Sequence, residues 1–336
     1  MEVEVLGSKE AIKAQKKAQA KFTKKGSVMG IVSAITFGFY SAVLGVALAM
    51  GPFTDEASLL VAPLVGAAMN DSLAALWLLI YNTIQGRSRE IWRSLKTLPG
   101  LIVCLAALLG GPIANAAYLL AIQFSGPAYA IPISALCPVV GALLARIFLK
   151  QKVTKRVMLG IVMCVTGAVI IGYTPPEGGS MPYFVLGLIC AFVAAFGWGA
   201  EGTLSAFGTA LIDPKVAINI RQATSGIVFI VVVVPIVGGL TMFGKAMVSP
   251  APLVIIAVAA LAAAVSFLTW YKANSMCGVA QGMALNSTYV LWGIIFSYFL
   301  GQAEMTTTLI VGAILVTLGA MLVAIDPREM FSKKEA

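Results

Sequence analysis

The strongest constraint on the fold is a series of apolar runs, each long enough to cross a lipid bilayer. A spanning helix needs about 20 mainly apolar residues. Ten runs reach that length, at roughly 28–50, 57–82, 97–121, 127–149, 156–173, 182–206, 216–242, 251–272, 278–300 and 306–325. Composition agrees, because 60% of the residues are hydrophobic and only 11% are charged. We therefore expect an all-α integral membrane protein with ten transmembrane helices.

The basic residues indicate the orientation of these helices. If the chain crosses ten times, 22 of its 23 Lys and Arg residues fall on one side, and only Lys245 falls on the other. The side with Lys245 also holds Asp55, Glu56, Glu177 and Glu304. Since cytoplasmic loops carry an excess of Lys and Arg, we predict a multi-pass protein of the cell (inner) membrane with both termini in the cytoplasm. The net charge of +9 then reflects orientation and not nucleic-acid binding.

Two polar segments flank the early runs. Residues 1–27 are rich in Lys and lack the short apolar core of a cleaved signal, so we expect a basic cytoplasmic N-terminal segment. The segment Arg87–Lys96 is charged and contains Trp92. We expect it to lie at the membrane interface.

The chain contains an internal repeat. A shift of 152 residues aligns four glycines of the first half with four of the second, and a shift of 157 aligns two further glycines and a phenylalanine. The first set pairs Gly126, Gly141, Gly160 and Gly167 with Gly278, Gly293, Gly312 and Gly319; the second pairs Gly30, Phe39 and Gly45 with Gly187, Phe196 and Gly202. Glycines seven residues apart share a helix face and allow close helix contact.

Because each copy has five spans, the second copy must enter the membrane upside down. The loop 149–156 is accordingly basic, whereas its counterpart 301–308 is acidic. We predict a first five-helix repeat at 28–173, an external linker at 174–181, a second repeat at 182–325 and a cytoplasmic tail at 326–336. Such inverted repeats are typical of secondary transporters, which bind solute near the midplane between the halves.

Two long stretches resemble a known family. The sequences AYAIPISALCPVVGALLARIFLKQKVTKRVMLGIVMCVTGAVIIG and GMALNSTYVLWGIIFSYFLGQAEMTTTLIVGAILVTLGAMLVA resemble the paired modules of EamA-type transporters of the drug/metabolite transporter superfamily. The resemblance implies two inverted five-helix halves around a central cavity, and it leaves the solute open. Lys152 stands where the first module usually has an acidic residue, and Val290 replaces the proline kept in the first module as Pro138.

Two acidic residues lie inside predicted spans. Glu201 is the one charged residue between Met181 and Ile212, and Asp71 lies near the middle of the second span. Ionisable groups at such depth are costly and usually functional; the alternative is a structural hydrogen bond to another helix. Leu44 occupies the place of Glu201 in the first repeat, which favours a specific task for Glu201. Both acids are candidates for proton or charge coupling.

Arg221 is a candidate partner for Glu201. It lies about one turn into the seventh span, near the same side of the membrane. A Glu201–Arg221 pair would serve as a gate or latch. The alternative is that Arg221 extends to the lipid headgroups.

Aromatic and amide residues near these acids are candidates to bind the solute. Spacing of three residues puts Trp198 beside Glu201 on one helix face, and an acid among aromatic rings suits an ammonium group through cation–π attraction. The predicted substrate-binding residues are Glu201, Trp198, Tyr40, Asn115, Tyr118, Trp270, Asn286, Tyr289 and Trp292. The alternative places these rings against lipid or neighbouring helices.

These features favour a secondary active transporter of a small organic solute that works by alternating access. The expected solute is an amine, a quaternary ammonium compound or an amino acid, with a proton or ion as coupling partner. The alternatives are a carrier of an anionic or sugar-type metabolite, or a channel or non-transporting protein of the same fold. No histidine occurs, and the five cysteines lack metal-ligand spacing, so we expect no enzyme activity, metal or cofactor. We expect a monomer or homodimer in the lipid bilayer.

Overall fold

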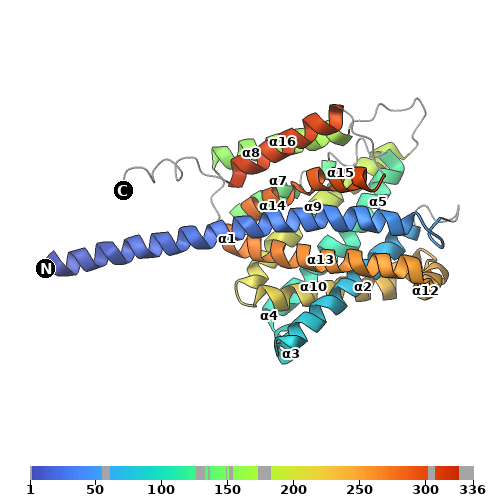
Figure 1. Ribbon diagram of the computed structural model, residues 1–336, viewed down its shortest axis with the longest axis horizontal. Helices are drawn as coiled ribbons and strands as arrows, with labels where there is room; N and C mark the ends of the chain where they lie inside the picture. Colours follow the sequence, from blue (N-terminus) through green and yellow to red (C-terminus); the bar gives the residue numbers. More distant parts are fainter. Residues whose placement is uncertain are drawn as a thin grey trace.

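The computed structural model is a bundle of helices that run along a common axis (Figure 1). It describes residues 2–54, 61–125, 133–134, 137–148, 150, 154–172, 183–301 and 307–324. Every secondary-structure element within those residues is a helix, which confirms the predicted all-α class. The predicted linker at 174–181, the tail at 326–336 and much of the fourth predicted span lie outside the described residues.

The described helices fall in both halves of the chain. In the first half they are α1 (Glu2–Leu48), α2 (Val61–Ile84), α3 (Ser88–Leu95), α4 (Leu98–Leu108), the π-helix η2 (Leu109–Ile113), α5 (Ala114–Ser125), α7 (Cys137–Phe148) and α8 (Lys155–Gly172). In the second half they are α9 (Phe184–Thr209), α10 (Pro214–Val228), the π-helix η3 (Phe229–Val233), α11 (Val234–Ile236), α12 (Leu240–Val248), α13 (Pro250–Cys277), α14 (Val279–Asn286), α15 (Tyr289–Phe299) and α16 (Thr307–Ala324).

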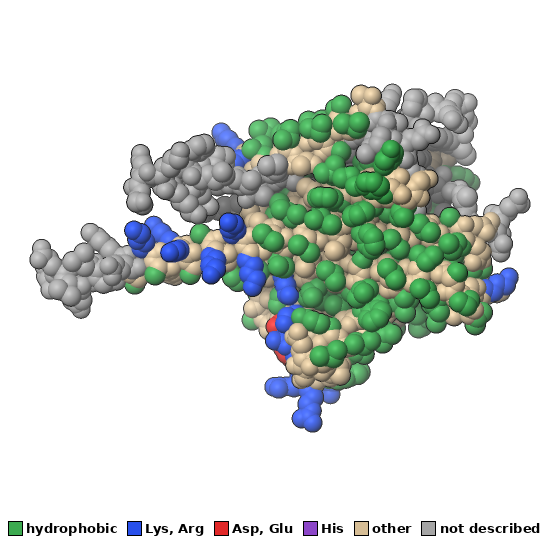
Figure 2. Space-filling model, in the orientation of Figure 1, with side chains coloured by type: hydrophobic (Ala, Val, Ile, Leu, Met, Phe, Trp, Pro, Cys, Tyr) green, Lys and Arg blue, Asp and Glu red, His purple; other side chains and the backbone are tan. Residues whose placement is uncertain are grey.

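Six helical stretches within the described residues are long and apolar enough to cross a membrane. They are Ala11–Leu48, Val61–Ile84, Leu98–Tyr118, Phe184–Thr209, Pro214–Ile236 and Pro250–Cys277. Shorter helices occupy the other four predicted spans, namely α7, α8, α14 with α15, and α16. Hydrophobic side chains cover most of the face shown in Figure 2, as expected of a surface that contacts lipid.

The basic N-terminal segment is helical and continuous with the first span. Residues 2–27 form the start of α1, which projects beyond the bundle (Figure 1). Lys13, Lys17 and Lys21 are exposed there. In Figure 2, Lys and Arg side chains line this projection and surround α3, while a single group lies at the opposite end, near α12.

The predicted boundaries hold less well at two places. The seventh span was expected to reach residue 242, but the helix ends at Ile236 because Gly238 adopts a left-handed φ of 71°, a conformation that terminates helices. The ninth span is interrupted between Asn286 and Tyr289, where α14 ends and α15 begins.

Each half packs its first helix against the other half. Helix α1 contacts α13, α14 and α15, and helix α9, its counterpart in the repeat, contacts α4, η2, α5 and α7. Equivalent helices of the two halves also meet, α2 with α10 and α8 with α16. This reciprocal exchange is the pattern that two inverted copies around a pseudo-twofold axis produce.

Helices α8 and α16 meet at the glycines that the repeat aligns. A Cβ atom on Gly319 would lie 2.6 Å from the carbonyl oxygen of Gly160, and one on Gly167 would lie 2.6 Å from that of Gly312. Between them, the Cys164 thiol donates to the carbonyl of Val316 at 3.5 Å. The pairs 160–319 and 167–312 run in opposite chain directions, so the two helices are antiparallel. Glycine is needed at both positions because backbone, not a flexible side chain, occupies the space.

We predict that Gly319→Ala destabilises the protein by about 1–3 kcal/mol, because the added methyl group must push two backbones apart. The matched control is Gly244→Ala in α12, where a Cβ meets nothing within 4 Å; it should leave stability unchanged or slightly higher. Thermal melting of both variants in detergent checks this. Equal melting temperatures for the two would show that α8 and α16 do not pack as closely as described.

Helices α2 and α10 cross through a ladder of polar contacts. Asn82 Nδ2 donates to the carbonyl of Lys215 at 3.0 Å, and Asn219 Nδ2 donates to that of Ala75 at 3.0 Å. Next to this ladder, Arg87 hydrogen-bonds Asp213. Burial raises the pKa of the Asp213 carboxyl, but the hydrogen bonds from Arg87 and from the Lys215 amide, with the positive charges of these two residues, together hold the pKa below its ordinary value. The two halves are therefore joined along the crossing of α2 and α10 by these polar contacts, with the Arg87–Asp213 pair beside them.

Candidate functional site

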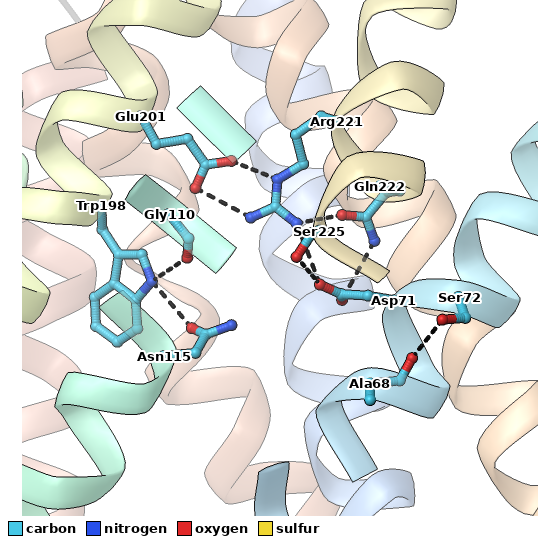
Figure 3. A network of polar contacts seen from close by, with 10 residues as sticks. All are labelled: Ala68, Asp71, Ser72, Gly110, Asn115, Trp198, Glu201, Arg221, Gln222 and Ser225. Carbon is cyan, nitrogen blue, oxygen red and sulfur yellow. Dashed lines mark hydrogen bonds and ion pairs between the residues drawn. The ribbon is translucent and has the colours of Figure 1, made fainter. Parts of the chain in front are cut away.

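Three charged side chains from three helices meet inside the bundle. Asp71 comes from α2, Glu201 from α9 and Arg221 from α10 (Figure 3). Their exposed fractions are only 4%, 2% and 2%. Since α2 belongs to the first predicted repeat and the other two helices to the second, this charge cluster lies between the halves.

Glu201 and Arg221 form a two-pronged ion pair. Arg221 Nε donates to Glu201 Oε1 at 2.5 Å, and Arg221 Nη2 donates to Oε2 at 3.1 Å. This fork-to-fork geometry fixes both side chains and is among the stronger protein contacts. The pairing that the sequence suggested is thus present, and Arg221 is buried and does not extend to the headgroups.

Asp71 approaches the same guanidinium from the other side. Its Oδ2 lies 3.6 Å from Arg221 Nη1 and accepts a hydrogen bond from Ser225 Oγ at 2.6 Å. Gln222 links the two, because its amide accepts from Arg221 Nη1 and donates to Asp71 Oδ1 at 3.5 Å. Within the described residues, one guanidinium therefore serves two carboxylates.

A π-helical turn makes room for the cluster. A Cβ on Gly110 would collide with the Glu201 carboxylate, and one on Gly111 would collide with Ser225 Oγ. Both glycines lie in η2, which also contains Pro112. Proline removes a helix hydrogen bond, and π-turns frequently occur at functional sites. The sequence Gly110-Gly111-Pro112 thus lets this backbone pass directly beside the charges.

Trp198 packs against this turn from α9. Its Nε1 donates to the Gly110 carbonyl at 3.0 Å and to Asn115 Oδ1 at 3.1 Å. The ring of Tyr118 lies 5.2 Å from that of Trp198, centroid to centroid. Three of the predicted substrate-binding residues therefore lie together, and one of them, Trp198, is one helical turn from Glu201.

A second aromatic group contacts Arg221 through Phe267. The guanidinium carbon of Arg221 lies 4.7 Å from the ring centre of Phe267, within the range of cation–π attraction. Between ring centroids, Phe267 is 6.3 Å from Tyr40. The Phe37 ring lies 4.8 Å from that of Tyr40 and 4.4 Å from that of Tyr289, again between centroids. Tyr40 and Tyr289 thus belong to one aromatic group that reaches the charge cluster through Phe267.

The other predicted residues lie around this group. Asn286 Nδ2 donates to Ser33 Oγ at 2.8 Å and so ties α14 to α1. Trp292 is half-buried in α15 and borders Gly38 of α1. Trp270 is 8% exposed in α13 and belongs to the apolar core that includes Met283.

The sequence analysis did not identify several contributors to the site. Gln222, Ser225 and Phe267 contact the charges directly, and Gly110 and Gly111 give them space. A signal was available for two of them, because Gln222 and Ser225 lie one and four residues after Arg221, on neighbouring faces of the same helix. Phe267 is one of 16 phenylalanines, and nothing in its neighbourhood distinguishes it.

Comparison with known proteins identifies the family. The EamA-like transporter family matches residues 24–173 and again residues 185–325. The chain belongs to the EamA-like transporter family. It is therefore a multi-pass membrane protein of the drug/metabolite transporter type, which moves small solutes.

Two individual proteins are similar over nearly the whole of this EamA-family chain. Protein LicB of Haemophilus influenzae is 25% identical over 301 residues, which cover 89% of this chain and 97% of that protein. A solved crystal structure covers 93% of this chain and 99% of its own, with 15% identity and a TM-score of 0.66. The structural match shows that the two chains share a fold.

We predict that the charge cluster responds unequally to loss of its members. Arg221→Gln leaves two buried carboxylates without a cation, so we expect a loss of about 3–5 kcal/mol of stability. Glu201→Gln should cost less, because Asp71 still neutralises Arg221. Thermal melting of the two variants in detergent tests the order. A Glu201→Gln variant that melts as low as Arg221→Gln, or lower, would contradict the shared-guanidinium geometry.

Proposed function

We propose that this EamA-family protein carries a small cationic or zwitterionic organic solute across the membrane by alternating access. An amine, a quaternary ammonium compound or an amino acid fits the site. Glu201 and Asp71 counter the positive charge or carry a coupling proton. The aromatic rings and amides around them hold the rest of the solute.

The observation that carries this proposal is the imbalance of charge in the cluster. Two carboxylates share one guanidinium among the described residues, so the ionised cluster has one negative charge in excess. An unbalanced charge in the membrane interior is costly. A bound cation or a bound proton would neutralise the excess negative charge. A cation carrier binds the first, and a proton-coupled carrier binds the second.

The aromatic surroundings also favour a cation. Phe267 already faces the guanidinium of Arg221, and Tyr40 and Tyr289 belong to the same aromatic group. Ring faces attract ammonium and guanidinium groups alike. An anionic solute finds less support, because Arg221 is fully engaged by Glu201, Asp71 and Gln222.

Arg221 is also placed to act as a gate. It joins Glu201 of its own half to Asp71 of the other half. If the inverted halves rock past each other, the contact between α2 and α10 must loosen. A solute cation that replaces Arg221 at one carboxylate would loosen the contact between α2 and α10. Binding of the solute would then be coupled to movement of the two halves.

We predict that purified protein in liposomes takes up a radiolabelled quaternary ammonium probe, and that Glu201→Gln lowers this uptake by about 10- to 100-fold through loss of a charged partner. The matched control is Glu90→Gln, a carboxylate in α3 outside the cluster, which should transport normally. Normal uptake by a folded Glu201→Gln variant would show that Glu201 has no role in transport.

Counterflow of the same probe separates the two uses of Glu201. If Glu201 only carries a proton, Glu201→Gln should still exchange labelled for unlabelled solute when no gradient is applied. If Glu201 counters the charge of the solute, exchange should fail together with uptake. A variant that does not fold in either assay would make Glu201 structural.

A further inference from the structure

Three buried side chains in α13, those of Trp270, Tyr271 and Asn274, carry polar atoms without a hydrogen-bond partner among the described residues. Asn274 is 2% exposed, and neither its Oδ1 nor its Nδ2 is paired; Trp270 is 8% exposed, and its Nε1 is likewise unpaired. Native proteins pair most buried polar groups, so each exception requires an explanation. Asn274 is the one described residue whose amide lacks a partner at both ends while buried.

Trp270 is linked to the neighbourhood of Glu201 through shared core neighbours, and Asn274 lies one turn further along α13. They are four residues apart and so share one face of α13. Trp270 belongs to a packed core that includes Val279 and Met283. The same two residues border Gly202, which follows Glu201 in α9. Between Trp270 and Asn274 in the chain, Tyr271 is fully buried close to Glu201 and Arg221.

The junction between α13 and α14 holds Asn274 in a fixed position. The main-chain oxygen of Asn274 accepts from the amide of Gly278 at 3.2 Å, so the backbone is satisfied and the side chain is not. A Cβ on Gly282 would collide with Asn274 Oδ1. Helix α14 therefore approaches Asn274 closely without offering it a hydrogen bond.

We propose that Asn274 and Trp270 form a hydrogen-bonding subsite for the transported solute. This inference rests on the proposed function: the cationic end of the solute goes to the Glu201–Asp71 carboxylates, and its other end goes to this subsite. Two donors, the Asn274 amide and the Trp270 indole, suit an oxygen atom of the solute. The Asn274 Oδ1 acceptor would receive a hydroxyl proton. The subsite therefore selects solutes that carry an oxygen function at a distance from the cation.

Stability gives the first test, because a binding residue and a structural residue respond in opposite directions. Asn274→Leu removes two unpaired polar atoms with little change in volume, so its melting temperature should rise. The matched control is Asn219→Leu, which loses the hydrogen bond to Ala75 and should melt lower. A fall for Asn274→Leu as large as that for Asn219→Leu would make Asn274 structural and overturn the proposal.

Binding of two matched probes gives the second test. Butyltrimethylammonium and (3-hydroxypropyl)trimethylammonium have the same number of heavy atoms, and only the second carries a hydroxyl. In Asn274→Leu, affinity for the hydroxyl probe should fall by about tenfold, the usual effect of one hydrogen bond, while affinity for the butyl probe stays equal or rises. An equal change for both probes would overturn the subsite.

The same titration distinguishes this failure from failure of the proposed function. If wild-type protein binds neither probe, or if Glu201→Gln binds both unchanged, the cationic solute is wrong and the subsite falls with it. If wild-type protein binds both in a Glu201-dependent way and Asn274→Leu does not discriminate between them, only the subsite is wrong.

Discussion

The whole arrangement depends on one buried guanidinium held between two carboxylates. Arg221 comes from α10, and its partners Glu201 and Asp71 come from α9 and α2. Charges at this depth are tolerated because they pair with one another, not with water. Their mutual attraction therefore draws three helices together at one point. Glycines at positions 110 and 111 leave room for this cluster, since any side chain there would occupy its space.

Packing between the halves places this charge cluster at their boundary. The first helix of each half packs on the other half, and equivalent helices meet as pairs, α2 with α10 and α8 with α16. Helices α8 and α16 contact each other at glycines, so their backbones lie close together. The α2–α10 pair is polar and carries the charges. One crossing is thus a close backbone contact, while the other is made of polar side chains.

Much of this could be predicted from the sequence. Long apolar runs predict helices, and charged residues within spans stand out against hydrocarbon, as Glu201 does. Arg221 was identified for the same reason. The orientation inferred from the asymmetry of Lys and Arg stays a prediction. The residues that meet between two packed helices were harder to predict, because a helix that is apolar on all sides gives no periodic signal for the face it buries. Phe267 and Asn274 could therefore not be assigned, although their chemistry is ordinary.

We propose that the excess carboxylate of the cluster holds either a proton or a solute cation, so that binding of one releases the other. Proton release on addition of tetramethylammonium to purified, weakly buffered protein measures this most directly. We predict release of about one proton per cation bound, since the membrane interior disfavours an unbalanced charge in either state, and none from Glu201→Gln. Tight binding of the cation without proton release in wild-type protein would contradict the claim.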